Sequence, residues 1–201
     1  MIGYSIVSLK DMIDVLGEKK SKEILSQFSC PLNADVESFI HNSAIELAKQ
    51  SVSATHLVFS SYISNTVIVG YFTLANKNII VFHKSLSKTL KKKISKFGTY
   101  DPDRKGYIIS APLIAQLGKN YSNNYNTLIT GDELLLIACN KISKAQELIG
   151  GKIAYLECED KSSLIEFYKS NGFVNFGTRK LDRDETELLT GDYLIQMLKY
   201  L

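Results

Sequence analysis

The feature that most constrains the fold is a central unit of strand, polar loop and helix within residues 113–151. Residues 113–117 are short and apolar, as in a strand, and residues 119–130 are the most polar segment of the chain. The following helix is predicted to begin at Gly131, to carry apolar residues on one face up to Ile149 and to end at Gly150 and Gly151. Strands are expected on both sides without regular β–α–β repetition, which indicates a mixed α/β fold and argues against a doubly wound dinucleotide fold.

The first half of the chain changes from helical to strand periodicity. After a short strand at residues 4–9, the spacing predicts one helix from Asp11 through Phe28 and a second helix that opens at Asp35. Residues 56–62 and 66–74 are rich in β-branched and aromatic side chains. The short break between them predicts a hairpin, and residues 79–82 are a candidate for a further strand.

The second half continues with a strand at 153–158, a helix at 162–169 and strands at 174–178 and 193–198. The chain has 201 residues, of which 45% are apolar, enough for one substantial core. We therefore expect a single domain over residues 1–201. Residues 84–105 are basic and weakly patterned, and we interpret them as an insertion that contains a short helix.

Charge and composition exclude several classes of protein. The formal charge of +3 is too small to imply nucleic-acid binding by itself, so any basic surface must be local. The longest apolar runs are far shorter than the roughly 20 residues of a membrane helix, and the first residues do not resemble an export leader. A cytoplasmic setting is expected. The cysteines are odd in number and widely spaced, which favours reduced, buried thiols over a zinc site.

The polar loop before the long helix is a candidate anion site. Backbone amides and the positive end of the helix dipole converge at such a position, and the Thr130–Gly131 step allows a close approach of the backbone to a phosphate. The alternative is an ordinary connection between a strand and a helix, since this pattern is common.

The segment after the long helix carries a more specific signal. Residues 156–160, 164–168 and 170–173 resemble the strand, helix and "YxxxGF" motif of the GNAT superfamily of N-acetyltransferases. The resemblance implies a GNAT fold, with a central mixed, mostly antiparallel sheet, a V-shaped splay between strands four and five and flanking helices. It further implies an enzyme that transfers an acetyl group from acetyl-CoA to a primary amine, without a metal.

The same resemblance assigns the site residues. The family's Arg/Gln-x-x-Gly-x-Gly/Ala loop falls on residues 126–131, where Gly131 agrees but Asn126 and Ile129 depart from the pattern. An amide near Gly118 or Lys119 is expected to polarise the thioester, and Tyr168 to act as general acid. For Tyr168 the alternative is packing on its helix. The residues expected to bind the cofactor are Leu117, Gly118, Lys119, Asn126, Thr127, Leu128, Ile129, Thr130, Gly131 and Asp132.

A second resemblance covers residues 28–30, 35–40 and 69–75, which are similar to the opening helices and "VGYYxLA" strand of GNAT toxins that act on aminoacyl-tRNA. The loop sequence also resembles proteins of prophages and mobile elements.

The acceptor is left open between RNA, protein and small molecule. The protein is expected to be a monomer or a homodimer and to have no membrane partner. Glu157 and Glu159 are weak candidates for a base. An inactive binding protein, motivated by the altered loop, and a toxin with an antitoxin partner are the alternatives. Residues 84–105 either face solvent or bind phosphates of an RNA or of the coenzyme.

Overall fold

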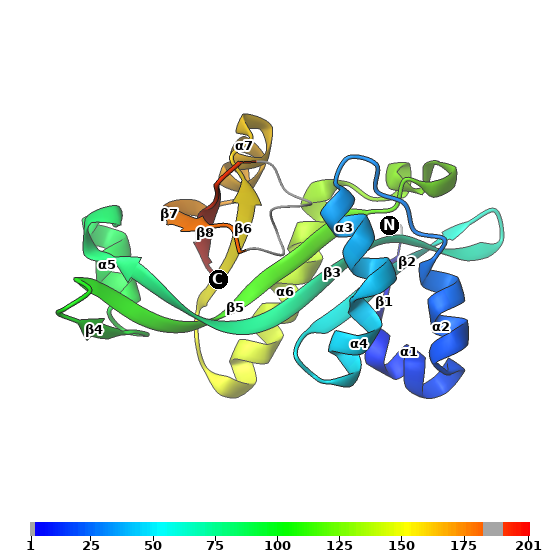
Figure 1. Cartoon of the computed structure of the whole chain (residues 1–201), viewed down its shortest axis with the longest axis horizontal. Helices are drawn as coiled ribbons and strands as arrows, with labels where there is room; N and C mark the ends of the chain where they lie inside the picture. The colour runs from blue at the N-terminus through cyan, green and yellow to red at the C-terminus, as the bar shows by residue number, and fades with distance from the viewer. Residues whose placement is uncertain (1–2, 183–190) are drawn as a thin grey trace. The chain divides into compact units, whose positions relative to one another are not determined.

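The computed structural model describes residues 3–182 and 191–201 and contains an eight-stranded mixed sheet with helices (Figure 1). The strand order is β1-β2-β3-β5-β6-β8-β7, with β4 paired to β5. The strands are Ser5–Ser8 (β1), Ala54–Tyr62 (β2), Asn65–Phe82 (β3), Thr99–Asp101 (β4), Gly106–Lys119 (β5), Ile153–Glu159 (β6), Val174–Lys180 (β7) and Tyr193–Tyr200 (β8). The α-helices are Leu9–Leu16 (α1), Glu18–Leu25 (α2), Ala34–Asn42 (α3), Ala44–Lys49 (α4), Lys88–Ile94 (α5), Gly131–Ile149 (α6) and Ser162–Ser170 (α7), and the 3-10 helices are His83–Ser85 (η1) and Ser122–Leu128 (η2).

The chain divides into two compact units. Unit 1 comprises Met1–Ala75 and Ala115–Ala138, and unit 2 comprises Asn76–Ile114 and Cys139–Leu201. Strands β3 and β5 and helix α6 each contribute residues to both units. The mixed, mostly antiparallel sheet with flanking helices confirms the predicted fold class, whereas a single domain over the whole chain stays a prediction.

In unit 1 the opening helices are more broken than predicted. The expected helix from Asp11 through Phe28 begins already at Leu9 and is divided at Gly17, whose φ of 79° lies in the region that glycine adopts readily. The next helix is capped by Asn33, whose side-chain oxygen accepts from the backbone N–H of Val36 at 3.2 Å. The apolar faces of α1 to α4 bury residues such as Leu9, Leu25 and Ile40 against β2 and β3 in one core.

The predicted hairpin of unit 1 is confirmed. Strands β2 and β3 pair in antiparallel register from Ala54 with Leu74 to Tyr62 with Asn65. The turn consists of Ile63 and Ser64, both at positive φ, as a two-residue hairpin turn requires. The separate strand expected at residues 79–82 is the continuation of β3.

In unit 2 the strands β6, β8 and β7 form an antiparallel group, and α7 lies beside β6 (Figure 1). Helix α5 confirms the short helix expected in the insertion. Strand β5 pairs with β6 in parallel through two residue pairs, Leu113 with Tyr155 and Ile114 with Leu156. This pairing extends over two residue pairs, which agrees with the predicted V-shaped splay between the two strands. The core of unit 2 contains Ile79, Val81, Leu86, Ile94, Ile109, Ala111, Ile153, Tyr155, Phe176 and Leu198.

Helix α6 has the predicted bounds, although its apolar face is buried only along the first part. Leu134 and Ile142 are each 1% exposed, whereas Ile149 at the C-terminal end is 79% exposed. The three cysteines are free and buried, as expected. Among the residues that the structure describes, no helix combines the length and the apolar character needed to cross a membrane.

Candidate functional site

Asn120 anchors the polar loop that follows β5 in unit 1. Its side chain is 2% exposed, and its amide nitrogen donates to the carbonyl of Ile68 at 2.9 Å. Its side-chain oxygen accepts from the backbone N–H groups of Ser29 and Ser122, each at 3.0 Å. A buried polar group needs hydrogen-bond partners, and the Asn120 side chain finds them in three parts of the chain. It therefore connects the loop to β3 and to the segment that precedes α3.

The loop itself is folded as the 3-10 helix η2 rather than being irregular. Asn123 and Asn124 interrupt it with φ values of 49° and 59°, a conformation that asparagine tolerates better than most residues. The predicted residues Asn126, Thr127 and Leu128 lie on η2. At its end, the carbonyl of Leu128 accepts from the hydroxyl of Tyr4 at 3.0 Å. The polar residues of this segment therefore form an ordered turn and not an open loop.

Lys119 is the cation nearest to this loop in sequence. Its ammonium nitrogen donates to the carbonyl of Asn126 at 3.0 Å and lies 6.0 Å from the ring centroid of Tyr121. The side chain is partly buried, and its amine stands at the last position of β5. Lys119 therefore connects the end of β5 to η2.

Gly118 has a packing role in β5. A Cβ atom at this position would overlap Cγ1 of Val36 in α3, so any side chain here would require Val36 to move. A Cβ atom at Gly70 of β3 would lie 2.9 Å from the carbonyl oxygen of Gly118. The two glycines allow β3, β5 and α3 to approach one another, and this close packing fixes the backbone next to Leu117 and Lys119.

A capping box closes the N-terminus of α6. The carboxylate of Glu133 accepts from the backbone N–H of Thr130 at 2.8 Å and from its hydroxyl at 2.9 Å, and the N–H of Glu133 donates back to that hydroxyl at 3.1 Å. These hydrogen bonds, first among them that of the Thr130 N–H, lower the pKa of Glu133. Glu133 is exposed. Its carboxylate lies where the positive end of the α6 dipole and the Thr130 amide favour negative charge.

The departures from the family loop have structural causes. Ile129, in place of the first glycine, is 2% exposed and is part of the buried interior. Asp132 lies in the first turn of α6, where an acidic residue interacts favourably with the helix dipole. The predicted cofactor-binding residues thus all belong to unit 1, in the segment from the end of β5 to the first turn of α6.

Tyr168 belongs to unit 2 and lies near the end of α7. Its ring contacts those of Phe167 and Phe173, with centroid distances of 5.0 and 5.9 Å. The residue retains some exposed surface, yet burial raises the pKa of its phenol well above the ordinary value, and Cys158 adds to the effect. The hydroxyl consequently keeps its proton throughout the neutral pH range. The role of Tyr168 as general acid stays a prediction, and packing on its helix stays the alternative.

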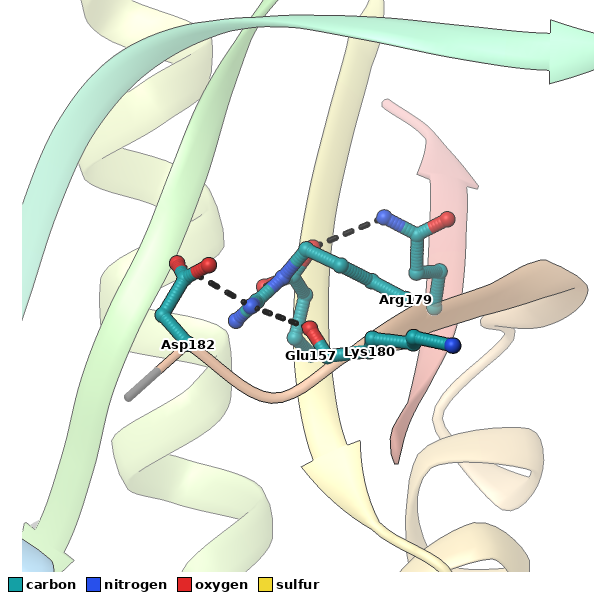
Figure 2. Close-up of polar contacts among 5 residues, drawn as sticks. Glu157, Arg179, Lys180 and Asp182 are labelled. Carbon is teal, nitrogen blue, oxygen red and sulfur yellow. Dashed lines mark hydrogen bonds and ion pairs between the residues drawn. The ribbon is translucent and has the colours of Figure 1, made fainter. Parts of the chain in front are cut away.

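The weak candidates for a base, Glu157 and Glu159, are both members of ion pairs in unit 2. Glu157 accepts from Nε of Arg179 at 2.8 Å (Figure 2). Gln196 donates to the other oxygen of this carboxylate at 2.8 Å. Arg179 also donates to a carboxylate oxygen of Asp182 at 3.4 Å (Figure 2). Glu159 accepts from Lys161 at 2.7 Å. Each carboxylate is thus held by a cation, and we assign no base.

Sequence reasoning missed Asn120, Glu133 and Tyr4. For Glu133 a signal was present, because Thr followed three residues later by Glu at a helix start is the pattern of a capping box. No local pattern identifies Asn120, whose partners are distant in sequence. Within residues 3–182 and 191–201, no group of three or more His, Cys, Asp or Glu side chains is arranged to hold a metal ion.

No protein-family model and no curated protein matches the sequence. The structure, in contrast, is similar to several solved structures. AtaT complexed with acetyl-methionyl-tRNAfMet has a TM-score of 0.62 and 17% identity over 96% of this chain and 94% of that chain. AtaTR bound with AcCoA has a TM-score of 0.56 and 16% identity over 96% and 91% of the two chains. A tyrosine-to-phenylalanine mutant of KacT has a TM-score of 0.60 and 15% identity over 96% and 93%. At these identities the similarity establishes the fold.

Proposed function

We propose that the chain is an acetyl-CoA-dependent N-acetyltransferase that acts on a primary amine. The observation that carries the proposal is the start of α6, where the Thr130 amide and hydroxyl hold the Glu133 carboxylate after a strand and a closed loop. The same fold in AtaTR, which binds AcCoA, and in AtaT, which was solved with an acetylated tRNA, supports it.

Several of the predicted residues have a definite task under this proposal. The N-terminus of α6 at Thr130 and Gly131, with Lys119, would hold the pyrophosphate of acetyl-CoA, because dipole and cation both favour negative charge. The backbone amide at Gly118 or Lys119 would donate to the acyl oxygen. When bound, acetyl-CoA supplies a thioester as the activated acyl group. Tyr168 would donate its proton to the departing sulfur.

Two more specific functions are candidates. The structures of AtaT with an acetylated tRNA and of a mutant AtaT toxin bound to the C-terminus of the antitoxin AtaR favour a toxin that acetylates aminoacyl-tRNA and has an antitoxin partner. In the opposite direction, the buried Ile129, which stands in place of the first glycine of the family loop, favours a protein that keeps the fold as an inactive binding module. Coenzyme binding separates the inactive version from the enzymatic one.

Titration of the full chain with acetyl-CoA and with free CoA tests the proposal, with calorimetry as the readout. We expect saturable binding to the wild type and a loss of at least about tenfold in affinity for Gly131→Glu, because a further carboxylate beside Asp132 and Glu133 at the helix start repels the pyrophosphate. Asn140→Glu is the matched control, since it adds the same charge at an exposed site further along α6. Absence of binding at millimolar coenzyme would contradict the enzymatic proposal. Equal losses of coenzyme affinity in the two variants would show that the coenzyme does not bind at the N-terminus of α6.

A further inference from the structure

We propose that residues 83–107, which comprise the connection between β3 and β5 and the first two residues of β5, form a binding surface for unpaired nucleotides of a nucleic acid. We call this segment the α5 insertion. It contains η1, α5 and β4, and it belongs entirely to unit 2. The proposal concerns nucleic-acid binding, which is measured separately from acetyl transfer. It rests on the proposed function in one respect: the surface would hold an RNA that carries the acceptor amine.

The α5 insertion concentrates the positive charge of the molecule. It contains eight basic residues and two acidic ones, a formal charge of +6, whereas the whole chain carries +3. The rest of the chain is therefore negative, with a formal charge of −3. The exposed basic residues of the insertion are Lys84, Lys88, Lys92, Lys93, Lys96, Arg104 and Lys105. Such local asymmetry is the electrostatic signature of a polyanion-binding surface.

The charges of α5 are unfavourable for the isolated helix. Lys88 occupies the first turn, which contains no acidic residue, although the helix dipole favours negative charge there. Lys88 and Lys92 are four residues apart and repel each other. In the part of the chain that the structure describes, no lysine of α5 pairs with a carboxylate, and the ion pair of the insertion joins Arg104 and Asp101 at 3.6 Å. An external anion would relieve this repulsion.

The apolar face of α5 is already used inside unit 2. Leu86 and Ile94 are 8% and 0% exposed, and Leu90 and Phe97 pack against the same core. A Cβ atom at Gly98 would lie 2.8 Å from Cγ1 of Ile109, so the chain after α5 also lies directly against β5. A helix that binds a membrane surface needs an exposed apolar face. Because α5 lacks an exposed apolar face, binding to a lipid surface is disfavoured. What α5 exposes is a set of lysines on a packed helix.

Aromatic rings continue the basic surface. The ring of Tyr100, which is 46% exposed, lies 5.3 Å from that of Tyr107 and 6.4 Å from that of His83. Nδ1 of His83 in turn accepts from the ammonium group of Lys91 at 3.2 Å. The backbone N–H of His83 donates to the carbonyl of Lys105 at 3.0 Å, which places a second basic residue beside the rings. Rings next to cations allow bases to stack while phosphates pair with lysines, which favours single strands over duplexes.

The test is fluorescence anisotropy of labelled oligo-uridine and oligo-thymidine with the full chain at a series of salt concentrations. In Lys88→Gln/Lys92→Gln/Lys96→Gln, we expect the slope of log K against log [salt] to fall by about 2, since each lost phosphate contact removes about 0.7 from it on single strands. At about 0.1 M salt this corresponds to a loss of roughly a hundredfold in affinity. Tyr100→Ser should weaken binding by roughly fivefold or more through lost stacking and leave the salt slope unchanged.

The matched control is Lys19→Gln/Lys20→Gln/Lys22→Gln, which removes the same charge from exposed positions of α2 in unit 1. Wild-type affinity in this control, with loss in the α5 variant, supports the proposal. Equal losses in both variants, tighter binding to a duplex of the same length, or binding to phosphatidylserine vesicles but not to oligonucleotides would each overturn it. Circular dichroism of every variant verifies folding. Calorimetry of the wild type with acetyl-CoA uses a different ligand, so a failure of the proposed function is recognised separately.

Discussion

At the scale of single residues, the proton of Tyr168 is the first property to test. Burial raises the pKa of this phenol, so the hydroxyl stays protonated below pH 10 and remains a donor at every physiological pH. We expect Tyr168→Phe to lower turnover by roughly 10²–10⁴-fold, the usual effect of losing a general acid, while the affinity for acetyl-CoA stays at the wild-type value. Steady-state kinetics and calorimetry measure the two quantities.

Tyr193→Phe is the control for this experiment, because it removes an equivalent hydroxyl from a residue that is 45% exposed. It should retain wild-type turnover. A fully active Tyr168→Phe variant would leave Tyr168 as one of the aromatic residues that pack with Phe167 and Phe173.

Several residues of the candidate site were accessible from the sequence, and others were not. Tyr168 and Gly131 were found because they belong to local motifs with fixed spacing. The constraint on Gly118 was invisible, since it comes from Val36, a residue of a different helix. Asn120 was invisible for the same reason, because its partners Ile68 and Ser29 are distant along the chain. Tertiary contacts, unlike motifs, leave no local pattern.

At the scale of elements, the start of α6 connects stability with anion binding. The Glu133 carboxylate occupies the position proposed for the pyrophosphate, and Glu133→Gln removes its charge while an amide oxygen can still accept from Thr130. We expect this substitution to tighten acetyl-CoA binding roughly two- to fivefold, as removal of a like charge from a helix N-terminus should do. Calorimetry measures the affinity. Glu147→Gln, an exposed position in the last turn of α6, is the control and should change little.

The same variant has a defined dependence on pH. The pKa of Glu133 is lowered in the folded state, so its stabilising effect is present above the ordinary value of about 4.5 and is lost as the pH falls through the folded value. The difference in melting temperature between wild type and Glu133→Gln should therefore be largest near pH 7 and shrink below about pH 4.5. A difference that is constant with pH, together with unchanged coenzyme affinity, would contradict the proposed role of the α6 N-terminus.

Element types were predicted well, and errors lie at boundaries. The predicted helix from Asp11 became two helices at Gly17, because a glycine at positive φ ends a helix that the apolar spacing alone continues. Strand β5 begins at Gly106, before the apolar stretch at residues 113–117, because pairing with β4 extends it. Propensity and periodicity identify an element, whereas its ends depend on tertiary partners.

At the scale of the whole molecule, the order of elements was sufficient to predict a mixed α/β sheet and to exclude a doubly wound fold. The local concentration of charge in residues 83–107 was also visible in the sequence, although the net charge of +3 conceals it. The division into two units was not predictable, since each unit is assembled from two separate stretches of chain.

The cysteines can report whether these units unfold together. Cys30 belongs to unit 1, Cys139 and Cys158 belong to unit 2, and each is at most 7% exposed. Burial raises the pKa of all three thiols, that of Cys158 to about 11, so few thiolates exist at pH 8 in the folded protein. We expect protection of all three from alkylation without denaturant, followed by labelling over one common range of urea concentration, because β3 and β5 are continuous through both units. Peptide mass spectrometry after pulse alkylation measures each thiol, with far-ultraviolet circular dichroism as the reference transition. Labelling of Cys30 at a lower urea concentration than Cys139 and Cys158 would show that unit 1 unfolds by itself, and the prediction of a single domain would then be wrong.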